Sequence, residues 1–259
     1  MNSAVRSPRP HPFFIPFSRR RLLQSIALAT TGFWAHGALA EMLALTARQT
    51  EGPFYPDHLP LDTDNDLIVV NNSLTPATGD ITYLSGHVVG PNGEPVRGAT
   101  VEIWQCDANG AYLHTKSGNA AKRDPNFQGY GRFLTAGTGE YLFRTIRPVP
   151  YPGRTPHIHA KVRMNGRELL TTQLYRKGYE QNETDGIYRS LRDPKARESV
   201  TMDFTPMSGV KGGAFAAKWD IVLGTTPPDS DPHDRVEVKG SPQGGPGGNR
   251  GPRPGPPPQ

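Results

Sequence analysis

Two histidines, His157 and His159, alternate along a segment whose other positions are mostly apolar. On a β-strand, residues two apart project from the same face, so both imidazoles can reach one metal ion. We expect Lys161 and Arg163 to continue this histidine face toward water. The opposite face would be core-facing and consists of Ile158, Ala160, Val162 and Met164. Taken alone, the pattern also fits two surface histidines without a metal.

Two tyrosines are candidates for the same site. Tyr151 lies in the proline-rich loop 150–154 (PYPGR), immediately before the histidines. Tyr112 follows the turn signal of residues 107–110 (DANG). Single tyrosines usually just pack among strands, so the significance of this pair depends on the elements around it.

Short alternating runs separated by Gly, Pro, Asn and Asp indicate strands rather than long helices. The expected strands are 82–89, 98–106, 140–146, 157–164, 169–175 and 214–223. One or two helical turns are expected over 185–198, where Pro194 suits a helix start. This pattern predicts an all-β fold, an antiparallel β-sandwich with short helical turns.

The two ends of the chain differ in composition from its middle. Residues 1–40 hold five arginines and no acidic residue, and the remaining 24 basic side chains balance the 24 acidic ones. The chain therefore lacks the basic surface that nucleic-acid binding requires. Residues 227–259 are rich in Pro and Gly, which predicts a disordered tail. One folded domain is expected over 41–226.

The basic leader resembles a twin-arginine signal peptide. Residues 18–24 (SRRRLLQ) match the export motif, and Ala38-Leu39-Ala40 forms a small-x-small cleavage site. The apolar stretch between them contains several polar residues and glycines, so we expect no stable membrane anchor. The chain is expected to be exported to the periplasm or the extracellular space.

The middle of the chain resembles the intradiol ring-cleaving dioxygenases, the non-haem iron(III) family of protocatechuate 3,4-dioxygenase. The similarity runs from residues 50–56 (TEGPFYP) to Gln173-Leu174-Tyr175 and includes 84–88 (LSGHV), 101–105 (VEIWQ), 141–146 (YLFRTI) and 154–159 (RTPHIH). The order Tyr, Tyr, His-x-His along the chain is the ligand order of that family.

The resemblance implies an iron(III) site and its ligands. The implied ligands are Tyr112, Tyr151, His157 and His159. Phenols lose a proton only beside a strong Lewis acid, and hard oxygen donors favour a hard trivalent ion. Two imidazoles, two phenolates and a hydroxide would leave the iron(III) centre neutral, which suits a buried pocket.

The same resemblance implies roles and partners. Arg154 and Gln173 match the family's active-site arginine and glutamine, and Tyr151 is the ligand that the family mechanism displaces. The implied substrates are a small catechol and O2, with no nucleic acid. Because a second homologous subunit sometimes completes the family's site, a homo-oligomer is compatible with the sequence.

Two other functions remain open at this stage. Residues 86–112 also resemble the carboxypeptidase-regulatory or transthyretin-like sandwich, which often serves as a non-catalytic binding module. A hydrolytic zinc enzyme is the third candidate, although tyrosine is a rare zinc ligand. The lone Cys106 excludes an internal disulfide, and small buried filler is its expected role. His58, His87, His114 and His233 match no ligand spacing.

Overall fold

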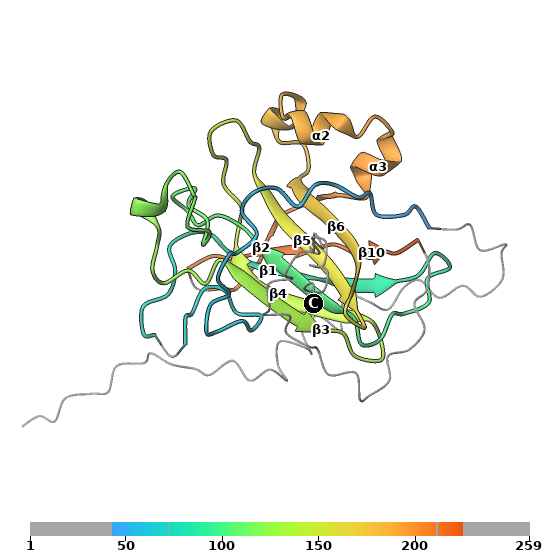
Figure 1. The fold of residues 1–259 in the computed structure, drawn as a ribbon, viewed down its shortest axis with the longest axis horizontal. Helices are drawn as coiled ribbons and strands as arrows, with labels where there is room; N and C mark the ends of the chain where they lie inside the picture. Colours follow the sequence, from blue (N-terminus) through green and yellow to red (C-terminus); the bar gives the residue numbers. More distant parts are fainter. Residues whose placement is uncertain (1–42, 72, 211, 225–259) are drawn as a thin grey trace, which may run out of the picture. The chain divides into compact units, whose positions relative to one another are not determined.

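The computed structural model describes residues 43–71, 73–210 and 212–224. Within them, two five-stranded sheets form a β-sandwich (Figure 1). The expected leader, residues 1–40, and the expected tail, residues 227–259, lie outside the described residues. The all-β prediction is confirmed.

The first sheet is built around its longest strand. That strand, β1 (Ile81–Val89), pairs antiparallel with β4 (Glu140–Ile146) and parallel with β9 (Phe215–Lys218) and β10 (Ile221–Val222), and β8 (Thr205–Pro206) pairs with β9. Every second residue of β1 is buried, the period expected of a strand with one face on the core. The parallel pairings are a departure from the purely antiparallel sandwich that the sequence predicted.

The second sheet carries the histidine pair on its central strand. Its order is β3 (Tyr130–Leu134), β2 (Thr100–Trp104), β5 (His157–Met164), β6 (Arg167–Arg176) and β7 (Thr201–Met202). The predicted strands at β4 and β5 match the observed bounds, whereas β3, β7 and β8 were missed. These three are short or glycine-containing segments, and pairing with a neighbouring strand makes them strands; for β3 and β7 that neighbour is distant in sequence.

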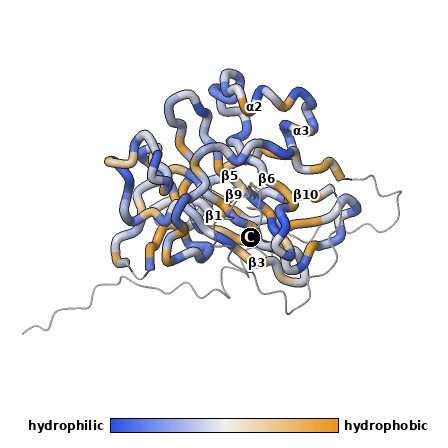
Figure 2. The backbone as a smooth tube through the Cα atoms, in the orientation of Figure 1, coloured by the Kyte–Doolittle hydropathy of each residue, from blue (hydrophilic) through white to orange (hydrophobic). Residues whose placement is uncertain are grey.

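The core lies between the sheets. Buried apolar residues from the first sheet, such as Leu84 and Phe143, meet others from the second, such as Ile158 and Val162. Figure 2 shows hydrophobic residues concentrated along the strands. Burial of this shared face is the main favourable free-energy contribution to folding.

Short helices lie in two connections of the second sheet, one between β2 and β3 and three between β6 and β7. They are η1 (Ala120–Lys122), η2 (Glu180–Glu183), α2 (Gly186–Ser190) and α3 (Pro194–Glu198). The helical turns predicted over 185–198 are confirmed: Asp185 caps α2, Asp193 caps α3, and Pro194 occupies the first helical turn. In the part of the chain that the structure describes, no helix has the length and apolar character that crossing a membrane requires.

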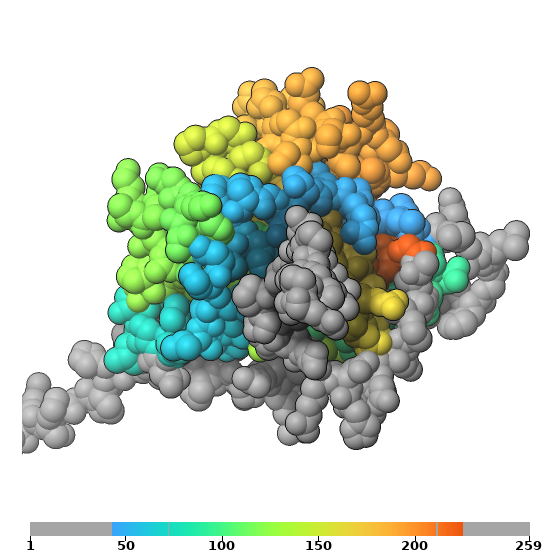
Figure 3. Space-filling model, in the orientation of Figure 1, coloured from blue at the N-terminus to red at the C-terminus, as the bar shows by residue number. Residues whose placement is uncertain are grey.

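Residues 43–55, which we term the strap, cross the outer face of β5 and β6 (Figures 1 and 3). The Gln49 amide donates to the Thr171 carbonyl (2.9 Å), and the Thr172 hydroxyl donates to the Ala47 carbonyl (2.6 Å). The histidine face of β5 is therefore covered rather than open to solvent.

The strap corrects the expectation that Lys161 faces water. Only 5 % of Lys161 is exposed, and its ammonium forms an ion pair with Glu51 and lies 4.1 Å from the centre of the Tyr55 ring. Alternation along β5 placed Lys161 on the histidine face correctly. It could not reveal the strap, which comes from a segment more than 100 residues away in sequence.

Gly86 marks the tightest approach between chain segments in the first sheet. A Cβ atom there would lie 1.7 Å from the Trp219 carbonyl oxygen, which accepts a hydrogen bond from the Tyr141 hydroxyl. Trp219 and Asp220 separate β9 from β10, although burial continues to alternate along this predicted strand. Only a residue without a side chain allows this crossing.

We therefore expect Gly86→Ala to lower the free energy of unfolding by about 3 kcal/mol, because backbone atoms must move to admit the methyl group. Urea denaturation of the purified protein measures this change. Gly137→Ala is the matched control, since a Cβ at Gly137 meets nothing within 4 Å. Equal stability of the two variants would contradict the close approach.

Candidate metal centre

Three donor atoms converge on one buried point. The Tyr112 hydroxyl lies 3.2 Å from His157 Nε2 and 3.1 Å from His159 Nε2, and the two Nε2 atoms are 3.2 Å apart. All three side chains are at most 2 % exposed. The structure thus brings together three of the four residues that the sequence predicted as ligands.

The spacing of these atoms fits a shared metal ion. Ligand atoms about 2.0–2.1 Å from one ion and about 100° apart lie roughly 3.1–3.2 Å from one another. His157 Nδ1 lies 2.7 Å from the Thr155 carbonyl, which only accepts, so Nδ1 carries the proton and Nε2 presents a lone pair. Imidazole and phenolate donors together suit iron. The residues present therefore fit a non-haem iron(III) ion.

The two histidines are held in different ways. The Thr155 carbonyl orients His157, the usual arrangement for a histidine ligand. His159 instead stacks on Trp104, with ring centres 4.8 Å apart and planes 9° apart, and its Nδ1 has no hydrogen-bond partner among the described residues. A Cβ at Gly52 of the strap would lie 3.3 Å from this ring. Packing rather than hydrogen bonding therefore fixes His159.

Tyr112 is positioned by a loop and by the strap. Asp107 accepts hydrogen bonds from the amides of Asn109 and Ala111, which shapes the predicted turn before Tyr112. The Phe54 ring of the strap stacks on the Tyr112 ring with centres 4.9 Å apart. The phenol is therefore clamped between a loop of the second sheet and the strap.

Tyr151 and Arg154 are the ends of one tight turn. Each donates its backbone amide to the carbonyl of the other, at 3.3 and 2.9 Å. Pro152 and Gly153, with φ of 82° at Gly153, give the type II geometry in which glycine is preferred at the third position. The Tyr151 ring packs edge-on to the Tyr112 ring at 5.6 Å between centres. The fourth predicted ligand therefore lies beside the other three, and it is less buried than they are.

The Arg154 guanidinium reaches three groups around the site. Its Nε donates to Asp185 at 2.8 Å, one terminal nitrogen lies 3.4 Å from the Tyr151 hydroxyl, and the other donates to Gln173 Oε1. Gln173, on β6, also donates to the Thr50 carbonyl of the strap (2.8 Å). Both residues predicted as active-site groups thus lie beside the candidate metal ligands.

Burial sets the ionisation of these groups. It lowers the pKa of His157 to about 3, with a further contribution from the nearby Arg154 charge, so the imidazole is neutral. Burial also raises the pKa of Tyr112 well above its ordinary value and, to a lesser degree, that of Tyr151. Both phenols therefore need a neighbouring cation to ionise at neutral pH.

Several residues of the site were missed by the sequence analysis. Trp104 lies within the 101–105 segment of the resemblance but was assigned no role, and Asp185 was noted only as the start of the predicted helical segment. Of the histidines that match no ligand spacing, His87 contacts Asp220 at 3.1 Å, away from the site. His233 lies outside the described residues. Cys106 is buried, as expected, and burial raises its pKa to about 12.

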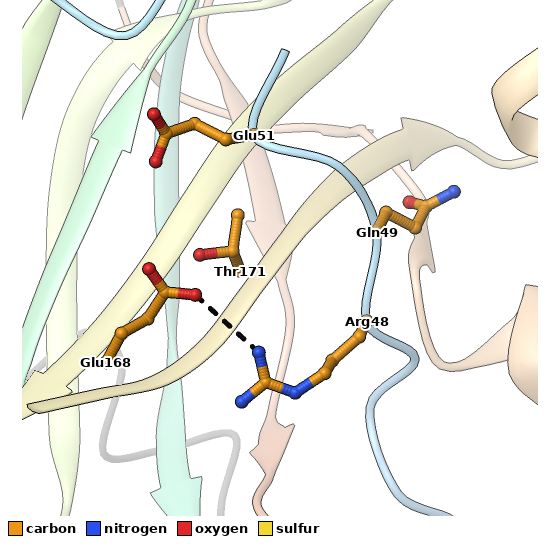
Figure 4. Close-up of a pocket in the computed structure, with 5 residues that line it drawn as sticks. All are labelled: Arg48, Gln49, Glu51, Glu168 and Thr171. Atoms are coloured by element: carbon orange, nitrogen blue, oxygen red, sulfur yellow. Dashed lines mark ion pairs between the residues drawn. The ribbon is translucent and has the colours of Figure 1, made fainter.

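The structure also contains a surface pocket between the strap and β6. It has a volume of about 250 Å³ and is lined by Arg48, Gln49, Glu51, Glu168 and Thr171 (Figure 4). None of the predicted site residues lines it.

Among the described residues, no cluster of three or more His, Cys, Asp or Glu side chains forms another potential metal site. The candidate metal centre contains only two residues of these types, both histidines, so its recognition depends on counting its tyrosines as well.

Comparisons with known proteins agree with this geometry. A family model described as Dioxygenase matches residues 50–225. The chain is 35 % identical to the protocatechuate 3,4-dioxygenase beta chain of Burkholderia cepacia over 63 % of this chain and 72 % of the relative. It is 30 % identical to a catechol 1,2-dioxygenase of Candida albicans over 67 % of this chain and 61 % of the relative.

Solved structures show the same fold. The dioxygenase domain of a dioxygenase carbohydrate-binding protein fusion from Streptomyces sp. SirexAA-E is 32 % identical, with a TM-score of 0.53 over 70 % of this chain and 99 % of that one. An intradiol ring-cleavage dioxygenase from Tetranychus urticae, 23 % identical, has a TM-score of 0.53 over 70 % of this chain and 94 % of that one. On its sequence match, supported by the common fold, this chain belongs to the intradiol ring-cleavage dioxygenase family.

Proposed function

We propose that this chain is a non-haem iron(III) dioxygenase that cleaves a catechol-type ring between its two hydroxylated carbons, consuming O2 and giving a muconate-type diacid. The observation that carries the proposal is the convergence of Tyr112, His157 and His159 beside Tyr151 and Arg154. A transthyretin-like binding module has no need for buried, converging lone pairs, which are costly without a bound partner.

Different residues of the chain would bind the metal and transfer the proton. When bound, iron(III) would supply Lewis-acid activation of the catechol ring toward O2. Tyr112, His157 and His159 would hold it, and their burial would exclude water from it. Tyr151, the more exposed phenol, would be the fourth ligand and the group that accepts a proton from an incoming catechol hydroxyl.

Arg154 would act on the substrate rather than on the metal. Its terminal nitrogens lie on the Tyr151 side of the centre, where an incoming ring would replace the phenol. A fixed cation there would stabilise the negative charge that develops on the ring carbon during attack by O2. Gln173, which accepts from Arg154, would keep the guanidinium directed at that point.

We also propose that the chain is exported by the twin-arginine route to the periplasm or the extracellular space. The support is residues 18–24 (SRRRLLQ) and the charge asymmetry of residues 1–40. Because this route carries folded passengers, an iron site assembled before export is compatible with it.

Removing one histidine ligand should remove the metal. The purified protein is expected to contain one iron per chain and to be red to burgundy, because two tyrosinates on iron(III) absorb visible light. His159→Ala should lose both the iron and the colour, as measured by metal analysis and visible absorption. His87→Ala, on β1, should keep both. Stoichiometric zinc in a colourless wild type would argue against the proposed function.

Removing the Arg154 charge should slow turnover without releasing iron. Arg154→Ala is expected to keep its colour and lose roughly 10²-fold or more in turnover, the scale for deleting one preorganised charge donor. Arg154→Lys should recover only part, because an ammonium lacks the planar fork. Oxygen uptake and product identification on a catechol panel measure this, with the exposed Arg192→Ala as control. A yellow semialdehyde product, or full turnover by Arg154→Ala, would refute the mechanism.

Replacing both motif arginines should block export. The double variant Arg19→Lys, Arg20→Lys is expected to remain in the cytoplasm, because the twin-arginine route reads the guanidinium pair. Cell fractionation of the producing strain followed by immunoblotting measures the distribution. Arg6→Lys, Arg9→Lys, outside the motif, is the matched control. Normal export of the motif variant would remove the assignment.

A further inference from the structure

One carboxylate behind the metal centre makes contacts that the proposed function does not yet explain. The Asp185 side chain is fully buried, and each of its oxygens accepts two hydrogen bonds. Oδ2 accepts from Arg154 Nε (2.8 Å) and from the Thr155 amide (3.0 Å). Oδ1 accepts from the Ile187 and Tyr188 amides at the start of α2 (both 2.9 Å).

These contacts fix the guanidinium from behind. A guanidinium is planar, so a hydrogen bond at Nε sets the plane and the direction of the two terminal nitrogens. With Nε held by Asp185, those nitrogens face the Tyr151 hydroxyl and Gln173 Oε1. Asp185 itself cannot shift, because its other oxygen is held by two backbone amides of α2.

The same carboxylate also reaches the backbone that orients a metal ligand. The Thr155 amide donates to Asp185, and the Thr155 carbonyl accepts from His157 Nδ1. Thr155 is further held by its hydroxyl, which donates to Asn182 at 2.7 Å. Asp185 is therefore one of two anchors for the Thr155 backbone but the only acceptor at Arg154 Nε that the structure shows.

We propose that Asp185 is the positioning residue for Arg154: it holds the guanidinium at Nε so that the two terminal nitrogens point at the substrate position. This inference rests on the proposed function and deepens it, since it explains how the arginine is aimed. Asp185 does not touch the substrate position, and its proposed effect on turnover is exerted through Arg154.

Charge balance supports this role. Burial acts to raise the pKa of the Asp185 carboxyl, but hydrogen bonds from the Tyr188 amide and Arg154 outweigh burial and leave the pKa below its usual value. Burial acts to lower the pKa of Arg154, but the hydrogen bond to Asp185 and the charges of Tyr151, Asp185 and Tyr175 together outweigh burial and raise the pKa. Both groups are therefore charged at neutral pH, and each compensates the other in a water-poor site.

A neighbouring residue separates this role from simple helix capping. Asp193 caps α3, a helix of the same length, by accepting from the Lys195 amide (3.0 Å). It is exposed and contacts no residue of the metal centre. A helix cap alone therefore needs neither burial nor donors outside the helix. Of these two caps, Asp185 has both: it is buried and accepts from Arg154 and Thr155.

The test uses variants that keep the cap. Asn and Ser cap helices about as well as Asp does, so Asp185→Asn and Asp185→Ser should preserve α2 while removing the charged acceptor at Arg154 Nε. Each is expected to keep iron and visible colour and to lose about 10–100-fold in kcat/KM on the catechol that the wild type cleaves. Asp193→Asn, the matched control, should keep wild-type turnover.

A double-mutant cycle with Arg154→Ala identifies the path of the effect. If Asp185 acts through Arg154, Asp185→Asn should change turnover less than about twofold when Arg154 is already alanine. A general structural role would give the same factor in both backgrounds and would overturn the proposal. Full turnover by Asp185→Asn and Asp185→Ser in the native background would overturn it as well.

A measurement on the metal-free protein gives a readout independent of turnover. The Nε–H signal of Arg154, assigned by its loss in Arg154→Lys, should exchange slowly with water in ¹⁵N NMR spectra. It should exchange rapidly in Asp185→Asn and remain slow in Asp193→Asn. Unchanged exchange in Asp185→Asn would refute the contact. A wild type that cleaves no catechol would refute the proposed function instead, whatever these spectra show.

Discussion

The cost of burying unpaired nitrogen and oxygen lone pairs is the constraint on which the rest of this structure depends. Tyr112, His157 and His159 converge within 3.2 Å of one another at a point that water does not reach. Burial keeps the imidazoles neutral and disfavours the phenolate. The cost of burying these donor atoms is therefore offset only when a cation binds them. The surrounding strands, strap and turn keep the three side chains from moving apart.

The surrounding elements divide that task. The two histidines share one rigid strand, β5, held between β2 and β6. The strap closes the outer face, where Phe54 stacks on Tyr112 and Gly52 approaches His159. The tight turn that presents Tyr151 is the least buried part of the centre. A rigid half and a more accessible half would suit the proposed function, in which the site holds a metal and admits a catechol ring.

Much of this could be predicted from local sequence. The bounds of β4 and β5, the two short helices and the turn before Tyr112 all follow from short-range signals: alternation, Asp caps and turn residues. The grouping of Tyr112, Tyr151 and the two histidines was predicted only through a family resemblance, because 45 residues separate Tyr112 from His157 and no local rule connects them. The structure brings them to one place without any further pattern in the sequence.

The environments of Lys161 and Asp185 were not predicted for the same physical reason. Lys161 was expected at the surface because alternation reports only which face of a strand a residue occupies, and a distant segment decides whether that face meets water. Asp185 was predicted only as part of a helical segment, because its contact with Arg154 spans 31 residues. The sequence alone thus determined the longer strands, the turns and the types of donor available to a metal. Tertiary structure alone decided which donors meet and which charges are buried together, since both depend on contacts between segments far apart in the chain.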